Sequence, residues 1–379
     1  MQVWIPRPGN ARPLCETGGV GLRVLIAGGG TGGHIFPALA VARELVARHS
    51  AEVVFVGTER GLETRLVPQA GFPLELIRVG PLNQVSLATR LRTLLDIPAS
   101  LFACRKLIGR YQPNVVLGIG GYASGPGVAA ALWMRVPTML FEPNAMPGMA
   151  NRLAGKRVQA AAVNFPAATR WFRNAEVTGI PVRPGFFELK APDPQAPPHL
   201  LVFGGSQGAR LFNQTLPKIM ASLLDALPRL TVMHQCGAKH VEPTMAAFKA
   251  SGADPQRWTV SAFLDDMPAE FGRAHLVMAR SGASTVAELA AAGRPSLLVP
   301  FARSADDHQK RNAEEMEKAG ASVMLTEEDL AIPDKLLQAL KDLLADPAKL
   351  AAMAAAAKMQ AHAGAAERIA HRLVELAQG

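Results

Sequence analysis

One pattern constrains the fold more than any other feature of the sequence, because it occurs twice. A short apolar run leads into a glycine-rich loop and then a helical pattern at residues 23–34, RVLIAGGGTGGH, and again at residues 199–210, HLLVFGGSQGAR. Glycine clusters of this kind are typical of places where the backbone needs positive φ or where another group approaches closely. The repetition predicts two similar α/β domains in tandem.

Short β-branched runs alternate with helical segments along most of the chain. The first half contains RVLIA, EVVFV, PLELIRV, NVVLGI and PTMLFE, and the second continues with AHLVMA and PSLLVP. This alternation is typical of doubly wound parallel sheets. A proline-rich connection, LKAPDPQAPP at residues 189–198, precedes the second repeat. We therefore predict an α/β protein with two Rossmann-like parallel-sheet domains that face a cleft.

The predicted domain limits follow from composition. Residues 1–20 form a loose leader, because prolines, glycines and charges interrupt the apolar segment that a signal peptide needs. Residues 21–183 form the first domain and residues 184–359 the second. The alanine-rich end from Asp346 onward is predicted as long helix, and its last part, about 360–379, can pack back on the first domain.

The overall composition is that of an ordinary globular protein with an anionic partner. The 379 residues are 49% hydrophobic, and a net charge of +9 favours contact with nucleic acid, phosphorylated metabolites or an acidic membrane. Three widely spaced cysteines without a CxxC pair argue against a disulfide framework or a zinc site, and favour a reducing cytosol. Residues 127–141, the most apolar later stretch, are broken by Arg135 and Pro137 and are shorter than the roughly 20 residues of a membrane span.

The first glycine loop is expected at the carboxyl edge of a sheet, where helix N-termini bind anions. Gly28, Gly30 and Gly33 match the spacing GxGxxG, and Glu59 ends the next predicted strand, so a dinucleotide site is one interpretation. A purely structural tight turn is another. The sequence lacks GK[ST] after a glycine loop, which disfavours a P-loop of the ATPase type.

His34 closes this loop just before Pro37, which is expected in the first turn of a helix. A lone histidine is often a packed core residue. Here its position places the imidazole near the predicted cleft, where a base with a pKa near neutrality can take a proton from a hydroxyl.

The second half offers further candidate contacts. GGSQGAR at residues 204–210 is a second anion cradle suited to a diphosphate, and RSGASTVAE places Glu288 about one turn inside a helix. Glu288 is either a bidentate acceptor for a ribose diol or a residue of a helix that Ser284 or Thr285 caps. PFARSADDHQ presents Asp307, His308 and Gln309 at the sheet edge, where an acidic helix start explains the aspartates equally well.

Together these segments resemble one family closely, the MurG glycosyltransferases. The matching segments are GGTGGH, GGYASGPG, EPNAMPGMAN, TGIPVR, GGSQGAR, FLDDM, RSGASTVAE and DDHQKRNA, in family order and covering most of residues 23–320. The resemblance implies the two-domain GT-B fold. It also implies an inverting transfer of N-acetylglucosamine from UDP-N-acetylglucosamine to the C4 hydroxyl of undecaprenyl-pyrophosphoryl-N-acetylmuramoyl-pentapeptide, the step from lipid I to lipid II in peptidoglycan synthesis.

The resemblance also implies roles for particular residues. His34 is the implied base and Glu142 the next candidate for catalysis, and both would line the acceptor side together with Gly30 and Tyr122. The implied donor contacts are Thr31, Gly32, Gly33, Asn144, Arg183, Ser206, Leu264, Ala283, Ser284, Thr285, Val286, Ala287, Glu288 and Gln309. The chain departs from the family pattern at FEPN, which lacks an extra glutamine, and at His308, which can be glutamine.

No metal and no cofactor is expected, because the sequence contains no Asp-x-Asp clamp and because helix N-termini and Arg183 can stabilise the departing diphosphate. The segment LATRLRTLLDIPASLFACRKLIGRY interleaves apolar residues with Arg90, Arg92, Arg105, Lys106 and Arg110. It suits an anionic membrane surface, although a core helix with snorkelling arginines fits the same periodicity. The implied location is peripheral, on the cytoplasmic face of the inner membrane, with other cell-wall synthesis proteins as possible partners.

Three rival functions remain at this point. A nicotinamide-dependent oxidoreductase would use GxGxxG and Glu59 but leaves the second glycine loop unexplained. A UDP-sugar epimerase of the same two-domain architecture would need no lipid acceptor. A non-enzymatic membrane or nucleic-acid binding protein would explain the charge, but not the paired glycine loops; nucleic acid is therefore not an expected partner.

Overall fold

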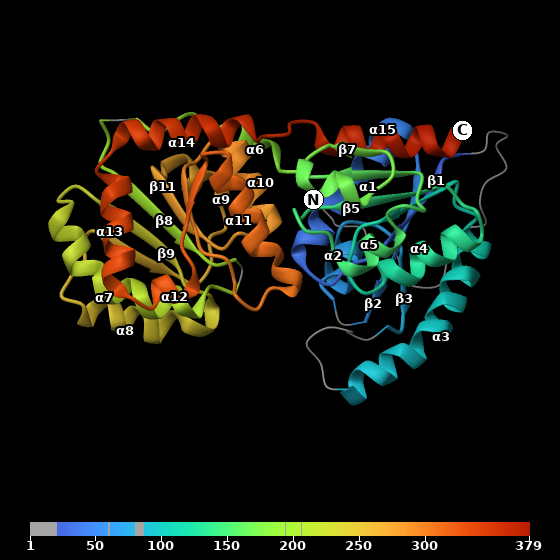
Figure 1. The fold of residues 1–379 in the computed structure, drawn as a ribbon, viewed down its shortest axis with the longest axis horizontal. Coiled ribbons are helices and arrows are strands. Elements are labelled where there is room, and N and C mark those ends of the chain that lie inside the picture. Colours follow the sequence, from blue (N-terminus) through green and yellow to red (C-terminus); the bar gives the residue numbers. More distant parts are fainter. Residues whose placement is uncertain (1–20, 60, 80–86, 194, 206) are drawn as a thin grey trace, which may run out of the picture.

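The computed structural model describes residues 21–59, 61–79, 87–193, 195–205 and 207–379. The predicted leader, residues 1–20, lies outside this part of the chain, as does Ser206. Figure 1 shows two halves side by side, each built around its own sheet, with the C-terminal chain running from one half to the other. The two sheets confirm the predicted pair of parallel-sheet domains.

The first sheet contains seven parallel strands in the order β3-β2-β1-β4-β5-β6-β7. Strand β1 lies between its neighbours with Leu25 opposite Val54 and Val116. The strands are β1 (Arg23–Ala27), β2 (Glu52–Thr58), β3 (Leu74–Ile77), β4 (Val115–Gly118), β5 (Thr138–Glu142), β6 (Ala160–Val163) and β7 (Ala175–Val177). The helices of this half are α1 (Gly32–His49), α2 (Glu63–Gln69), α3 (Leu87–Tyr111), α4 (Ser124–Trp133) and α5 (Met149–Ala154), followed by a 3₁₀ turn at Pro166–Trp171.

The second sheet contains six parallel strands in the order β10-β9-β8-β11-β12-β13. They are β8 (His199–Phe203), β9 (Thr231–Gln235), β10 (Trp258–Ser261), β11 (Leu276–Ala279), β12 (Ser296–Leu298) and β13 (Ser322–Met324). The helices are α6 (Pro184–Phe187), α7 (Arg210–Ala226), α8 (Val241–Ala250), α9 (Met267–Arg273), α10 (Ala283–Ala292), α11 (His308–Lys318), α12 (Glu327–Leu330), α13 (Pro333–Leu344) and α14 (Pro347–Met359), with 3₁₀ turns at Ala238–His240 and Ala305–Asp307. In each half, the strand–glycine loop–helix repeat occupies the centre of its sheet.

Helices cover both faces of the first sheet because successive strand side chains point to opposite faces. Val24 and Ile26 pack on one face with residues of α1, whereas Leu25 and Ala27 pack on the other with residues of α3 and α4. The strands are therefore apolar on both faces, which is the reason they appear in the sequence as continuous apolar runs.

The C-terminal end, where long helix is predicted from Asp346 onward, contains a break. It forms two helices, α14 and α15 (Ala365–Gln378), and Gly364 at the start of α15 has a φ of +72°. Helix α15 lies along the first half in Figure 1, and its buried residues Ile369, Ala370 and Leu373 join the core that α1 covers. The chain thus returns to the first half after completing the second.

Candidate functional site

The first glycine loop passes directly against a second loop of the same half. A Cβ atom at Gly28, whose φ is +141°, would lie 2.2 Å from the carbonyl oxygen of Gly120. The backbone N–H of Gly29 donates to that same oxygen at 3.1 Å. Only bare backbone fits here, so these glycines are needed for the contact between residues 28–30 and the loop that follows β4.

Helix α1 begins at Gly32, and its N-cap residue Thr31 makes no side-chain capping hydrogen bond. The first N–H groups of an α-helix lack partners within the helix and carry a partial positive charge. A Cβ atom at Gly33 would lie 3.7 Å from Oγ of Ser284, which belongs to α10 of the other half. The N-termini of α1 and α10 therefore face each other across the boundary between the halves.

His34 lies in the first turn of α1 and packs against Gly120, where a Cβ atom would come within 2.9 Å of its Cε1 atom. Its Nδ1 atom is buried and has no hydrogen-bond partner. Burial, with a further contribution from the charge of His308, lowers the pKa of His34 from 6.5 to about 4, while the Ile119 backbone and Glu63 oppose the shift. The imidazole is thus neutral near pH 7 and can accept a proton.

Glu142 ends β5 and is buried, with 2% of its surface exposed. Its carboxylate accepts hydrogen bonds from the backbone N–H groups of Asn144, at 3.0 Å, and Gly148, at 3.1 Å. The side-chain amides of Asn144 and Asn151 also donate to it, at 3.1 and 3.0 Å. With both oxygens engaged, Glu142 holds the following loop in place, which favours a positioning role over the role of a base.

The loop that Glu142 holds makes a direct contact with the second half. Asn312 of α11 is fully buried, accepts from the Ala145 backbone N–H at 2.9 Å and donates to Oδ1 of Asn144 at 3.2 Å. It also donates to the carbonyl of Ser281 at 3.1 Å. Sequence reasoning missed Asn312, although it belongs to the quoted segment DDHQKRNA. Its contacts join Asn144 of the first half to the α10–α11 region of the second.

The start of α10 carries six of the fourteen predicted donor contacts, residues 283–288. Ala283, Val286 and Ala287 are buried, and Oγ of Ser284 is buried without a hydrogen-bond partner. Glu288 lies 3.9 Å from Nη2 of Arg183, which precedes α6. Burial raises the pKa of Glu288 from 4.5 to about 7, and the charge of Arg183 opposes this. The structure thus brings Arg183 and the α10 start together.

Three further predicted residues occupy different environments. The side chain of Gln309 accepts from the backbone N–H of Phe301 at 3.0 Å, so it supports the loop after β12. Leu264 is buried, with 8% of its surface exposed, and Tyr122, beside Gly121, is 48% exposed. Ser206 lies outside the described residues.

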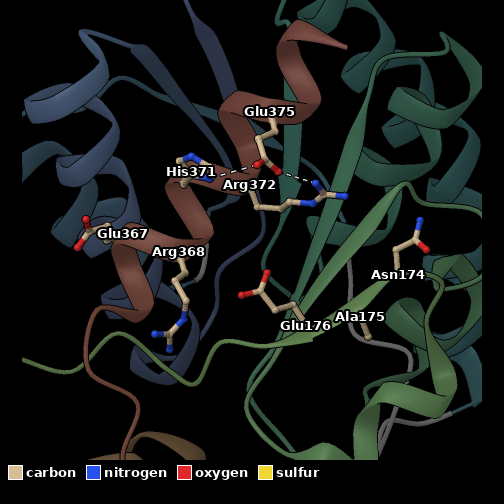
Figure 2. Close-up of a pocket in the computed structure, with 8 residues that line it drawn as sticks. All are labelled: Asn174, Ala175, Glu176, Glu367, Arg368, His371, Arg372 and Glu375. Carbon is tan, nitrogen blue, oxygen red and sulfur yellow. Dashed lines mark hydrogen bonds and ion pairs between the residues drawn. The ribbon is translucent and has the colours of Figure 1, made fainter.

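A hollow elsewhere on the molecule is not part of this site. It lies between β7 and α15 (Figure 2), and most of the side chains that line it are ionisable. Its volume is about 560 Å³. Glu375 pairs with Arg372 at 2.5 Å and with His371 at 3.4 Å, so much of this charge is already matched. None of the glycine-loop residues line this hollow, so we do not assign it to the catalytic site.

Residues 24–163 match the glycosyltransferase family 28 N-terminal domain, and residues 199–369 match the glycosyltransferase family 28 C-terminal domain. The chain belongs to glycosyltransferase family 28. A family 28 relative from Nitrosococcus oceani is 45% identical over 94% of this chain and 99% of its own length, and one from Anaeromyxobacter dehalogenans is 43% identical over 94% and 93%. Both bear the name UDP-N-acetylglucosamine–N-acetylmuramyl-(pentapeptide) pyrophosphoryl-undecaprenol N-acetylglucosamine transferase.

Solved structures agree with membership of family 28. The crystal structure of Acinetobacter baumannii MurG has a TM-score of 0.79 and 29% identity, over 93% of this chain and 99% of that one. A putative UDP-N-acetylglucosamine 2-epimerase from Listeria monocytogenes has a TM-score of 0.62 at 14% identity, which shows a shared fold alone. The fold is GT-B and the protein is a glycosyltransferase, so the oxidoreductase interpretation of GxGxxG is wrong.

Proposed function

We propose that this glycosyltransferase transfers N-acetylglucosamine from UDP-N-acetylglucosamine to the C4 hydroxyl of undecaprenyl-pyrophosphoryl-N-acetylmuramoyl-pentapeptide. The observation that carries the proposal is that the N-termini of α1 and α10 face each other, with a Cβ at Gly33 only 3.7 Å from Ser284 Oγ. Two helix N-termini supply two anion sites, and both substrates of this reaction carry a diphosphate. The activity named for the family 28 relatives supports the choice of substrates.

The donor is assigned to the second half. Glu288 accepts hydrogen bonds from the two ribose hydroxyls, the backbone at Leu264 reads the uracil edge, and Ala283 to Ala287 follow the phosphates. Arg183, 3.9 Å from Glu288, is placed to contact the donor diphosphate. The sugar is assigned to Asn144 and Gln309. Ser206, a further proposed phosphate contact, lies outside the described residues.

The acceptor is assigned to the first half. Gly30 and Tyr122 line its site, and Thr31 to Gly33, at the N-terminus of α1, contact both the transferred sugar of the donor and the phosphates of the acceptor. Glu142 holds the Asn144 loop through its four hydrogen bonds and so fixes the wall of this site.

The chemical step is one displacement. The acceptor oxygen forms a bond to the anomeric carbon from the face opposite UDP while the bond between that carbon and the UDP oxygen breaks. UDP leaves with the electron pair, and the hydroxyl proton passes to the neutral imidazole of His34. The bound diphosphates raise the affinity of His34 for this proton, because nearby negative charge favours the imidazolium form. An α-linked donor thus gives a β-linked product, and no resident metal or cofactor takes part in the proposed step.

A peripheral position on the cytoplasmic face of the inner membrane is part of the proposal, because the acceptor carries a lipid. Helix α3 projects from the first half in Figure 1. On it, exposed Phe102 contacts exposed Trp133 of α4 at 6.0 Å between ring centroids, and Arg105 lies 4.7 Å from the Trp133 ring. A basic and aromatic surface of this kind suits anionic lipid headgroups. Arg110 pairs with Glu75, and the side chains of Arg90 and Arg92 lie outside the described residues.

No helix in the described part of the chain combines the length and apolarity that a membrane crossing requires. We expect Phe102→Ser with Arg105→Glu to reduce co-sedimentation with vesicles containing anionic lipid. Glu52→Gln, an exposed change at the start of β2, serves as the control and should leave vesicle binding unchanged. Equal binding by the double variant and the control would remove this surface from the proposal.

The activity is tested with UDP-N-acetylglucosamine labelled in the sugar, with and without the lipid-linked muramoyl acceptor. The expected result is release of UDP and a labelled lipid-linked disaccharide only when the acceptor is present. Conversion of UDP-N-acetylglucosamine to another UDP-sugar without acceptor would favour an epimerase instead.

A further inference from the structure

Glu63 is a buried carboxylate to which the catalytic proposal assigns no role. It is the first residue of α2 and has 0% of its surface exposed. Its Oε1 atom accepts from the backbone N–H and from Oγ1 of Thr58, both at 3.0 Å, and its Oε2 atom accepts from the backbone N–H of Gly30 at 2.7 Å. A buried charge is costly unless it is hydrogen-bonded, and here a donor of the first glycine loop supplies one of the bonds.

The chain is shaped around this side chain. A Cβ atom at Gly29 would lie 2.5 Å from Cδ of Glu63, one at Gly57 would lie 2.6 Å from its Cγ, and one at Gly61 would lie 1.8 Å from its Oε2. Three glycines, one from the first glycine loop and two from the stretch that precedes Glu63, thus leave room for one carboxylate. In addition, the Leu62 backbone N–H donates to the carbonyl of Gly30 at 3.2 Å, so Gly30 is bound through both its N–H and its C=O.

The opposite side of the glycine loop is bound as tightly. Gly29 donates to the carbonyl of Gly120, and a Cβ atom at Gly121 would lie 2.1 Å from the carbonyl of Gly29. The loop is therefore held between the Glu63 carboxylate and the Gly120–Gly121 backbone. His34, four residues after Gly30, packs on that same Gly120.

We propose that Glu63 is a positioning residue for the transfer reaction, and that its carboxylate occupies the anion position at Gly30 and thereby fixes the α1 N-terminus and His34. This inference rests on the proposed function, because it assigns the loop to the acceptor. In a dinucleotide-binding loop, the ligand's phosphate takes the backbone donors of the glycine turn. Here a side chain of the protein takes the Gly30 N–H, so the acceptor's diphosphate is directed to the donors that follow, at Gly32 and Gly33.

The test variant is Glu63→Gln, which keeps the shape and removes the charge. A glutamine keeps one acceptor oxygen and replaces the other with an NH₂ group, which is a donor. Either the Gly30 N–H or the Thr58 N–H would then point at another donor and lose its hydrogen bond. We expect turnover at saturating donor and acceptor to fall about tenfold or more. We expect UDP affinity to stay within about twofold, since the proposed uracil and ribose contacts, at Leu264 and Glu288, belong to the other half. Glu52→Gln is the matched control and should behave as the unmodified protein.

The pH profile separates positioning from simple stability. The charged groups facing His34 are Glu63 of α2, which raises its pKa, and His308 of α11, which lowers it. The acid limb of the kcat/KM profile reports the pKa of the base, His34. Removing the Glu63 charge lowers that pKa and should therefore move the limb to lower pH. A merely structural residue would lower the melting temperature and leave both the limb and the turnover of the folded fraction unchanged, and that result would overturn the inference.

Hydrogen exchange does not depend on enzyme activity, so it tests the role of Glu63 separately from the proposed function. Hydrogen exchange of the segment 28–34 should be faster in Glu63→Gln than in the unmodified protein, whatever the substrate proves to be. Should Glu63→Gln fail to fold, Thr58→Val removes only the hydroxyl donor and should give a smaller change in the same direction. Unchanged turnover and exchange in Thr58→Val would then contradict the inference. Absence of transfer by the unmodified protein would instead contradict the proposed function.

Discussion

Burial shifts His34 and Glu288 toward their uncharged forms. The pKa of His34 falls to about 4 and that of Glu288 rises to about 7, in both cases mainly because burial disfavours charge. The proposed substrates supply the missing partners: diphosphates beside His34 and a ribose diol for Glu288. Substrate binding is therefore expected to change the charge of both side chains.

We predict that UDP binds more tightly as the pH rises through 7. The diol binds the carboxylate form of Glu288, and that form becomes the minority below the pKa of about 7. Between pH 8 and pH 6, the affinity measured by calorimetry should fall about tenfold.

Glu288→Gln should bind UDP weakly at both pH values. The difference between the two proteins isolates the carboxylate, because titration of the UDP phosphate is common to both. Glu328→Gln, at an exposed position of α12, is the control. The same pH dependence in Glu288→Gln would exclude a diol contact.

We predict that His34→Ala lowers turnover by about a hundredfold or more and leaves UDP affinity nearly unchanged, because general-base assistance acts in the transition state. The measurement is turnover of the folded variant at saturating donor and acceptor, beside its melting temperature. His49→Ala, at the opposite end of α1, is the control. Near-normal turnover with reduced stability would make His34 a core residue.

At the scale of elements, the sequence predicted the strands and glycine loops but not the contacts made around them. Apolar runs are visible locally, so β1, β8 and their neighbours lie where expected. Glu142 was named as a candidate for catalysis, and its four hydrogen-bond donors could not be foreseen because they come from the folded loop that follows it. Glu63 and Asn312 were missed because the partners that give them their roles, Gly30 and Ala145, lie 33 and 167 residues away in sequence. The one local signal was the pair of glycines that precede Glu63 in GTERGLE, Gly57 and Gly61, because glycine leaves room for a neighbouring side chain.

The break between α14 and α15 was missed for a different reason. Alanine, lysine and methionine favour helix through most of this segment, and the low helix propensity of Gly364, which has a φ of +72°, was overlooked. The break lies at this glycine, and α15 beyond it docks on the first core, where Leu373 is fully buried.

We predict that Leu373→Ala destabilises the first half selectively, by about 2–5 kcal/mol, because it leaves a cavity in that core. Hydrogen exchange of strands β1 and β4 should accelerate, while exchange of β8 and β11 should change little. Leu340→Ala is the matched control, since Leu340 is equally buried in the core of the second half. It should show the opposite pattern. Equal acceleration of all four strands in both variants would mean that the halves unfold as one unit.

At the scale of the molecule, the chain passes between the halves at two places that touch each other. The first crossing, residues 178–184, follows β7, and the second, residues 360–364, precedes α15. A Cβ atom at Gly179 would lie 2.2 Å from Cβ of His362. Arg368 of α15 donates to the carbonyl of Ala363 at 2.9 Å and to that of Thr178 at 2.5 Å. One side chain therefore joins both crossings.

We predict that Arg368→Gln loosens the relative orientation of the two halves. The variant loses two hydrogen bonds from a charged donor, so kcat/KM should fall by about tenfold, because both substrates must meet in one cleft geometry. UDP affinity should change less than about twofold, since the donor contacts lie largely within the second half. Hydrogen exchange at residues 178–184 and 360–364 should increase.

Arg372→Gln is the matched control for this prediction. Arg372 lies one turn further along α15 and pairs with Glu375 of the same helix, and Figure 2 shows its side chain pointing in a different direction from that of Arg368. The Arg372→Gln change removes a positive charge from the same surface and leaves the hydrogen bonds of Arg368 to both crossings in place. Turnover and exchange should therefore stay close to those of the unmodified protein. If the two variants lose activity equally, surface charge on α15 matters and the link between the crossings does not, because only Arg368 contacts Thr178 on one crossing and Ala363 on the other.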